Sequence, residues 1–273
     1  MKSILVPIDF SEHCENALEV ASILARQFDA ELILFHMVGI SESVLSKSEL
    51  EEQEEAKYYL QLAKKRLSTF IDRPYLKELT VRTIIQNLKD FGEVAQVAEE
   101  KEAGLIVMGS HGTSGLKSFF VGSNTEKVVR TSTIPVLVIK TKRFSFTINH
   151  ILFATDLEEE SALAYRKVAA FAKALGAKLT VVHINTIGTM FQSNGQILKK
   201  VEGFHEILGE KVPVEIYNDY TVEEGIYNYA KTVEADLVSI PTHGRKGLAH
   251  FFLGSIGENL ANTAKLPVLT VKI

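Results

Sequence analysis

Short apolar runs alternate with longer stretches of helical periodicity along the chain. In the first half, the apolar runs that predict strands are 4–8, 31–37, 79–85, 105–108 and 136–140. The stretches with apolar positions every three or four residues, which predict helices, are 14–28, 49–70, 91–102 and 123–131. Near-continuous apolar strands separated by helices are typical of a parallel sheet with helices on both faces. The pattern therefore predicts an α/β fold.

The second half of the chain repeats the first. Residues 3–9, SILVPID, align with residues 150–156, HILFATD, at an offset of 147. Later the offset falls to 132, which aligns Gly122 with Gly254. The change in offset means that the second half lacks about fifteen residues of the first. We place this loss in the charged segment 43–71.

The repeat predicts two tandem Rossmann-like units, each a five-stranded parallel sheet flanked by helices. We expect the units to span residues 1–143 and 144–273, with a polar linker at 141–147. Ligands on such sheets bind outside the carboxyl ends of the strands, where the strand order reverses. Asp9 and Gly109 each follow a predicted strand, so we expect them to share one crevice.

Composition narrows the class of protein. The chain has 273 residues, 46% of them hydrophobic and 23% charged, with a net charge of −4, which favours neither nucleic acid nor an anionic membrane as a partner. Cys14 is the only cysteine, so an intrachain disulfide is excluded and a reducing compartment is favoured. No apolar run approaches the roughly 18 residues of a membrane span. We therefore expect a cytoplasmic protein.

Residues 109–124, GSHGTSGLKSFFVGSN, form a glycine-rich turn between a strand and a helix. Such a turn lets backbone N–H groups approach a phosphate. Gly112 and Gly122 are candidates for this close approach, and Ser123 for a phosphate donor. The alternative is purely structural, because turns often contain glycine and Ser123 with Glu126 spells a capping box.

Three stretches, together with the glycine spacing, resemble one known family. They are VPIDFS with Asp9, LIVMGSHG, and IPVLVIK, and the spacing is G-x2-G-x9-G-[ST] from Gly109 to Ser123. The chain is similar to tandem-domain members of the universal stress protein family. The resemblance implies an α/β sandwich related to adenine-nucleotide α-hydrolases. It also implies ATP binding where the glycine pattern is complete.

The resemblance implies an adenine-nucleotide site in the first half, for ATP, AMP or ADP, with or without Mg²⁺. Its expected residues are Pro7, Ile8, Asp9, Val38, Met108, Gly109, His111, Gly112, Gly122, Ser123 and Asn124. Pro7 and Ile8 would shape the base pocket, and Val38 would offer an apolar wall and a backbone group to the adenine edge. Asp9 would contact the ribose or adenine side, although it could instead cap the next helix.

The second half keeps only part of this set. The residues that remain are Asp156, Gly244, Gly254 and Ser255. Pro241 stands at the position of Gly109, and proline removes a backbone donor and fixes φ. We expect this site to be degenerate. His36 and His183 align with each other and are expected to be structural, as is Cys14.

These observations favour a regulatory nucleotide-binding protein over an enzyme, because the chain has no Walker lysine and no general base placed beside the glycine turn. At most, ATP hydrolysis would be slow. The alternatives are a binder of another small molecule, an interaction module, or an adenylyl-transfer enzyme. The resemblance also implies pairing through the last strands, 136–139 with 268–271, as an internal pseudo-dimer, with homodimerisation of whole chains as a further option. The sequence names no protein partner.

Overall fold

The computed structural model describes residues 1–38, 49–87, 90–110, 123–140, 146–188, 191–242 and 266–273, with the backbone alone for 49–56. Its strands are β1 (Ser3–Pro7), β2 (Glu31–Met37), β3 (Val81–Gln86), β4 (Leu105–Gly109), β5 (Val136–Ile139), β6 (His150–Ala154), β7 (Lys178–Thr186), β8 (Val214–Asp219), β9 (Leu237–Thr242) and β10 (Val268–Lys272). The helices are α1 (Glu12–Phe28), α2 (Glu49–Ile71), α3 (Glu93–Glu100), α4 (Ser123–Thr131), α5 (Glu159–Leu175), α6 (Asn194–Leu208) and α7 (Val222–Thr232), with a 3₁₀ turn η2 (Pro74–Leu76).

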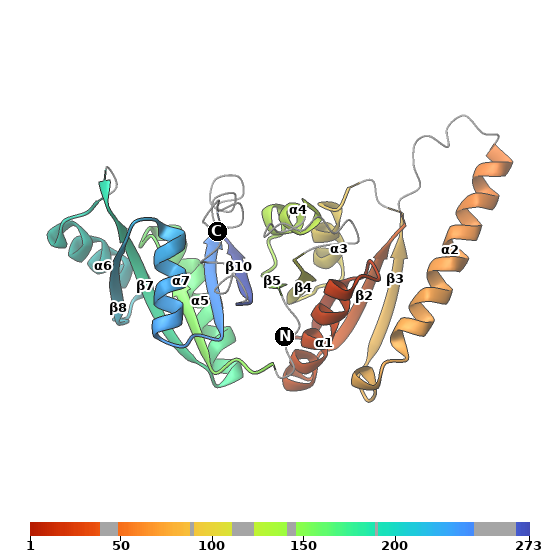
Figure 1. Ribbon diagram of the computed structural model, residues 1–273, viewed down its shortest axis with the longest axis horizontal. Coiled ribbons are helices and arrows are strands. Elements are labelled where there is room, and N and C mark those ends of the chain that lie inside the picture. The colour runs from red at the N-terminus through yellow and green to blue at the C-terminus, as the bar shows by residue number, and fades with distance from the viewer. Residues whose placement is uncertain (39–48, 88–89, 111–122, 141–145, 189–190, 243–265) are drawn as a thin grey trace.

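All ten strands belong to one sheet, in the order β3-β2-β1-β4-β5-β10-β9-β6-β7-β8. The five strands of each unit run parallel to one another, and the second unit repeats the strand order of the first. The two units lie side by side, with β5 and β10 in the middle (Figure 1). The predicted α/β fold of two five-stranded tandem units is confirmed.

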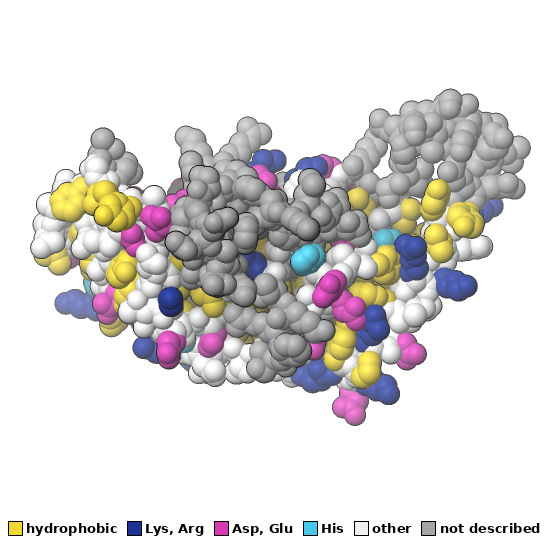
Figure 2. All heavy atoms as spheres, in the orientation of Figure 1, with side chains coloured by type: hydrophobic (Ala, Val, Ile, Leu, Met, Phe, Trp, Pro, Cys, Tyr) yellow, Lys and Arg dark blue, Asp and Glu magenta, His cyan; other side chains and the backbone are white. Residues whose placement is uncertain are grey.

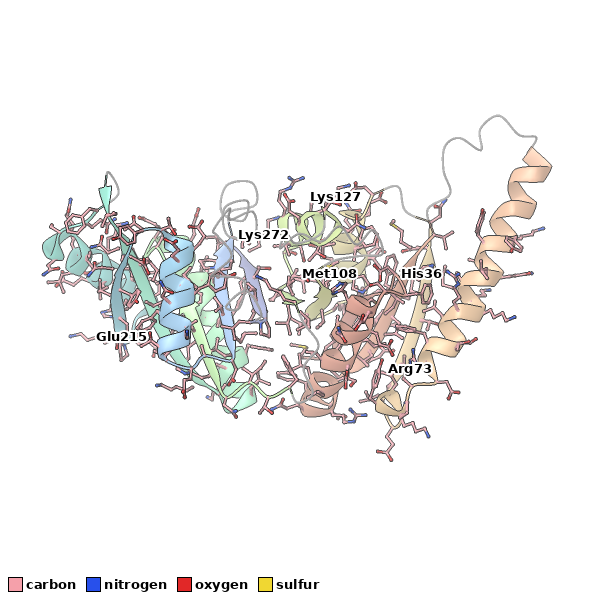
Figure 3. The ribbon with its side chains drawn as sticks, viewed as in Figure 1. His36, Arg73, Met108, Lys127, Glu215 and Lys272 are labelled. Carbon is pink, nitrogen blue, oxygen red and sulfur yellow. The ribbon has the colours of Figure 1, made fainter. Side chains whose placement is uncertain are left out.

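The units meet where β5 and β10 pair antiparallel, with Val138 opposite Val268 and Val136 opposite Thr270. The Thr270 hydroxyl adds a buried hydrogen bond to the Val136 carbonyl oxygen, at 3.2 Å. Lys272, labelled beside this seam in Figure 3, donates from Nζ to the Thr131 carbonyl oxygen of α4 at 3.1 Å. Each unit thus covers the edge that the other would expose to solvent.

Helices cover both faces of the sheet, as a parallel sheet requires. Alternate strand residues, such as Ile4 and Val6, pack with α1, α2, α5 and α6 on one face. The residues between them, such as Leu5, pack with α3, α4 and α7 on the other. Each face carries a core that runs through both units, and Phe28 of α1 stacks on Phe171 of α5 at 5.7 Å between ring centroids.

The duplication is visible in the backbone conformation. Phe10 and Leu157 follow the first strand of each unit and share the left-handed conformation, with φ of 63° and 65°. Asp29 and Gly176 end the first helix of each unit, with φ of 49° and 66°. Only glycine adopts this conformation without a steric cost, so the first unit carries strain that the second avoids.

One helix is shorter than the pattern predicts. α3 ends at Glu100 instead of 102, because Glu102 turns left-handed with φ of 52° and the next N–H, of Ala103, bonds back to the Ala98 carbonyl oxygen at 2.9 Å. Glu234 has the same conformation after α7, with φ of 53°. Hydrophobic periodicity continues through such a stop and does not reveal it.

The length difference between the units lies partly in one helix. α2 has 23 residues and its counterpart α6 has 15. α2 lies at the outer edge of the molecule beside β3 (Figure 1). This agrees with a loss within segment 43–71. The rest of that segment and most of the predicted linker, residues 141–145, lie outside the described residues.

The surface carries charges of both signs, and Lys, Arg, Asp and Glu are interspersed over the face shown in Figure 2. Within the described part of the chain, no helix combines the length and the apolar character that a membrane crossing needs.

The matched helix ends Asp29 and Gly176 yield a stability prediction. Asp29→Gly should raise the free energy of unfolding by about 1 kcal/mol, because it relieves a left-handed residue that is exposed. Gly176→Ala should lower it by about 1 kcal/mol, although a Cβ there meets no atom within 4 Å. Chemical denaturation measures both, and shifts of the same sign would contradict this account.

Candidate functional site

The first candidate site lies where the strand order of the first unit reverses, at the carboxyl ends of β1 and β4. Its cavity is lined by Pro7, Asp9, Cys14, Phe91, Met108, Gly109, Asn124 and Thr125. The structure therefore brings together residues of three segments that the sequence assigns to one site. These walls enclose about 30 Å³, so they form the floor of a site and not a whole nucleotide pocket.

Asp9 is positioned by the turn that leads from β1 into α1. Its Oδ1 accepts hydrogen bonds from the Ser11 backbone N–H at 2.9 Å and from the Ser11 hydroxyl at 2.6 Å. Ser11 is the N-cap of α1, with its Oγ accepting from the Cys14 N–H at 3.1 Å. Asp9 therefore supports the cap and is not the cap itself. Both bonds use Oδ1, and no described residue donates to Oδ2.

Ile8 and Val38 do not line this cavity. Ile8 is buried, and its N–H donates to the Phe35 carbonyl oxygen at 2.7 Å. The carbonyl oxygen of Ile8 accepts from His36 Nδ1 at 2.7 Å. Val38 N–H donates to the Gln86 carbonyl oxygen at 2.9 Å. A ligand edge that bonds the Val38 backbone would therefore have to donate to its carbonyl oxygen.

Gly109 has a packing role that the sequence did not reveal. A Cβ at this position would stand 2.7 Å from the carbonyl carbon and oxygen of His13 in α1. The close approach of α1 to β4 thus requires glycine. The Gly109 carbonyl oxygen accepts from the hydroxyl of buried Thr125 at 2.8 Å, which ties the first turn of α4 to the end of β4. A threonine inside a helical stretch gives no sequence signal of this bond.

The sequence assigns three further residues of the glycine turn to the site. His111, Gly112 and Gly122 lie outside the described residues. Ser123 is the first residue of α4, and Glu126 lies in its first turn. Ser123 and Asn124 are both exposed in the first turn.

Cys14 packs in the core, as the sequence predicts. It is 4% exposed, and its Sγ donates to the Pro7 carbonyl oxygen at 3.5 Å. Burial raises the pKa of the thiol to about 12, so the sulfur stays protonated and is a poor nucleophile at neutral pH. Among the described residues, no group of three or more His, Cys, Asp or Glu side chains could hold a metal ion.

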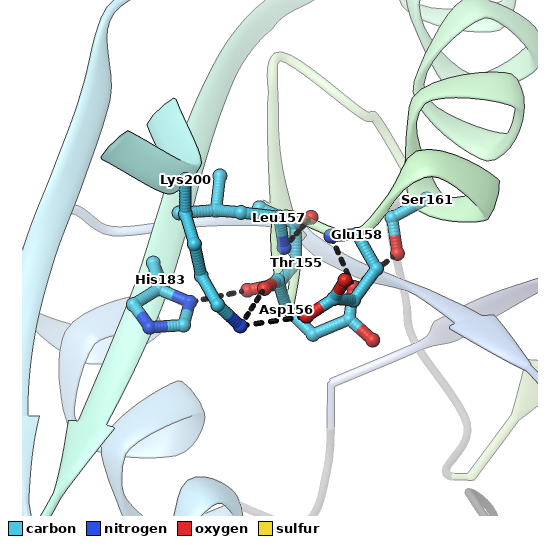
Figure 4. A network of polar contacts seen from close by, with 7 residues as sticks. All are labelled: Thr155, Asp156, Leu157, Glu158, Ser161, His183 and Lys200. Atoms are coloured by element: carbon cyan, nitrogen blue, oxygen red, sulfur yellow. Dashed lines mark hydrogen bonds and ion pairs between the residues drawn. The ribbon is translucent and has the colours of Figure 1, made fainter. Parts of the chain in front are cut away.

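The second unit builds an equivalent turn from different side chains. Asp156 Oδ1 accepts from the Glu158 N–H at 3.0 Å and from the Ser161 hydroxyl at 2.5 Å (Figure 4). Lys200 of α6 reaches over this turn, with Nζ 2.6 Å from Glu158 Oε1 and 3.5 Å from the Asp156 carbonyl oxygen. The remaining predicted residues of this half, Gly244, Gly254 and Ser255, lie outside the described residues.

The aligned histidines make the same bond in both units, as expected for a structural role of Nδ1. His183 Nδ1 lies 2.9 Å from the carbonyl oxygen of Thr155, and His36 Nδ1 lies 2.7 Å from that of Ile8. Burial lowers the pKa of His183, although its bond to Thr155 acts in the opposite direction. The imidazole of His183 is therefore neutral at pH 7, with Nδ1 as the donor and Nε2 as an acceptor.

The packing role of Gly109 yields a test. Gly109→Ala should lower the free energy of unfolding by about 1–3 kcal/mol, because the new methyl overlaps the backbone of His13. Gly203→Ala, in α6, is the control, since a Cβ there meets no atom within 4 Å. It should be neutral or stabilising by up to about 1 kcal/mol. Equal effects in chemical denaturation would mean that Gly109 is not needed for packing.

Comparison with known proteins agrees with the fold. A universal stress protein of Methanocaldococcus jannaschii is 33% identical over 162 residues, which cover 52% of this chain and 96% of that protein. A universal stress protein of Mycolicibacterium smegmatis is 25% identical over 289 residues, 98% of this chain and 96% of its own length. The crystal structure of a universal stress protein from Archaeoglobus fulgidus superposes with a TM-score of 0.67 at 18% identity, over 99% of this chain and 96% of that one.

The family match extends over both units. The pattern of the universal stress protein family matches residues 1–140 and, separately, residues 147–272. Two matches in one chain agree with the repeated strand order and with the repeated turn after the first strand of each unit. The chain therefore belongs to the universal stress protein family, and both of its units are of that family's type.

Proposed function

We propose that the chain is a regulatory protein that binds an adenine nucleotide, ATP above all, through its N-terminal unit. The observation that carries the proposal is the shared cavity floor of Asp9, Met108, Gly109 and Asn124. These residues come from the turn after β1, from β4 and from α4, and meet at the point of strand reversal where ligands of such sheets bind. The complete glycine spacing, which the second unit lacks, supports this choice of unit.

The first turn of α4 would hold the phosphates. A helix start presents backbone N–H groups and the positive end of the helix dipole. Ser123 and Asn124 are exposed there, and Thr125 fixes the turn against β4 through its bond to Gly109. Asp9 would accept a hydroxyl or amine hydrogen of the nucleoside through Oδ2, because Oδ1 is occupied by Ser11.

We further propose that the bound nucleotide acts as a signal and is turned over slowly at most. The described residues that line the cavity include no lysine, arginine or histidine. The Cys14 thiol is protonated at neutral pH, and the Asp9 carboxylate supports the helix cap. Neither is placed to activate a water against a phosphate. Nucleotide occupancy would then change the surface that the N-terminal unit presents to a partner.

Paired variants at the two aspartates test which unit binds ATP. Asp9→Ala should weaken ATP binding by about tenfold or more in isothermal titration calorimetry, because it removes a charged acceptor. Asp156→Ala is the matched control, since it also deletes an aspartate that holds the turn after a first strand. It should leave ATP affinity within about twofold. Thermal unfolding of both variants checks that the two folds are equally intact.

The two aspartate variants can also contradict the proposal. If Asp156→Ala weakened ATP binding and Asp9→Ala left it unchanged, the nucleotide would be assigned to the second unit. Equal ATP affinity in the wild type and a Gly122→Val variant, which should crowd the phosphate turn, would also contradict it. Phosphate release from ATP at the rate of an ordinary enzyme, about 1 s⁻¹ or faster, would overturn the regulatory role.

A further inference from the structure

The second unit has a cavity at the position where the first unit has only a shallow one. It measures about 420 Å³ and lies at the carboxyl ends of β6, β7 and β9, between α6 and α7. The residues that line it are Ala154, Thr155, Asp156, Glu158, His183, Ile184, Thr186, Gln192, Lys200, Val222, Ile226, Ile240 and Pro241. This volume falls within the range of small-molecule sites, of about 300–1,000 Å³.

A buried asparagine holds Gln192, one of the residues that line this cavity, in place. Asn185, near the end of β7, is 5% exposed. Its Oδ1 accepts from the Gln192 backbone N–H at 2.9 Å, and its Nδ2 donates to the Gln192 carbonyl oxygen at 3.2 Å and to Asn218 Oδ1 at 3.1 Å. The first unit has Val38 at the aligned position, which cannot make these bonds. The second unit therefore has a fixed wall that the first unit cannot build in this way.

Gln192 lines the cavity and carries a buried acceptor atom. Gln192 Oε1 has no hydrogen-bond partner among the described residues. A buried polar atom without a partner costs free energy, which a ligand that donates a hydrogen bond recovers. His183, which also lines the cavity, adds a second acceptor at Nε2, because its Nδ1 is engaged with Thr155. Two acceptor atoms on residues that line the cavity favour a ligand with N–H donors.

The charges around the cavity disfavour an anion. Asp156 and Glu158 bring two carboxylates, and the ammonium of Lys200 is engaged with the Glu158 carboxylate and with the Asp156 backbone carbonyl oxygen. The described lining thus carries one net negative charge. Pro241 stands where the first unit has Gly109 and offers no backbone N–H. A phosphate or carboxylate would meet acceptors and like charge here.

We propose that the C-terminal unit is a second binding site, for a small uncharged or monocationic molecule with an apolar body and an amide, amidine or amine N–H donor. Ile184, Ile226 and Ile240 would contact the apolar body. Gln192 would accept the N–H. This site differs in ligand class from the nucleotide site of the first unit and does not depend on that site being occupied.

Three planar probes of similar shape test the ligand class on the full chain. Benzamide is neutral, benzamidine is a cation and benzoate is an anion without N–H groups. Benzamide and benzamidine should bind with about millimolar dissociation constants, as fragment-sized ligands do, and should shift the methyl resonances of Ile184 and Ile226. Benzoate should bind at least about tenfold more weakly. Equal binding of benzoate, or shifts elsewhere for all three probes, would overturn the proposal.

A matched pair of glutamine variants tests the acceptor. Gln192→Leu should weaken benzamide binding by about tenfold. Gln86→Leu, in β3 of the first unit, is the control, because Gln86 Oε1 is also buried without a partner but lies outside this cavity. It should leave the benzamide affinity unchanged. An equal loss in both variants would contradict a role for Gln192, and displacement of benzamide by ATP in the Asp9→Ala variant would assign the cavity to a nucleotide instead.

Discussion

The antiparallel pairing of β5 with β10 is the constraint on which the rest of the structure depends. An unpaired last strand in either unit would present a row of backbone donors and acceptors to solvent. Val136 and Val138 meet Thr270 and Val268 instead, and the two units become one ten-stranded sheet. Because the sheet is continuous, the core on each face is continuous as well, and the position of one candidate site relative to the other is fixed by backbone hydrogen bonds.

On this shared frame the two units have diverged at the same place. Both keep an aspartate after the first strand, a left-handed residue next to it, and a histidine that bonds the end of that strand. The divergence is in what surrounds them. Glycine at 109 lets α1 approach β4 closely, whereas proline occupies the aligned position 241 and lines an open cavity. The duplicated turn therefore lies in a different environment in each unit.

Much of the fold and part of the first candidate site could be predicted from the sequence, because hydrophobic periodicity and internal repetition are visible in the sequence itself. They gave the order of strands and helices, the tandem units, and the meeting of Asp9 with Gly109. What they missed depends on contacts between distant segments. The bond from Thr125 to Gly109, the overlap that a side chain at 109 would make with His13, and the hold of Asn185 on Gln192 exist only after folding. No spacing in the sequence marks them.

The central claim is that one sheet carries two sites of different ligand class, of which one takes an adenine nucleotide. Native mass spectrometry of the full chain titrated with ATP counts the bound nucleotides directly. The account predicts a single ATP for each chain, still bound when benzamide is present at saturation. Two ATP molecules for each chain would show that both units bind the nucleotide. A chain that binds no ATP would contradict the proposed nucleotide site.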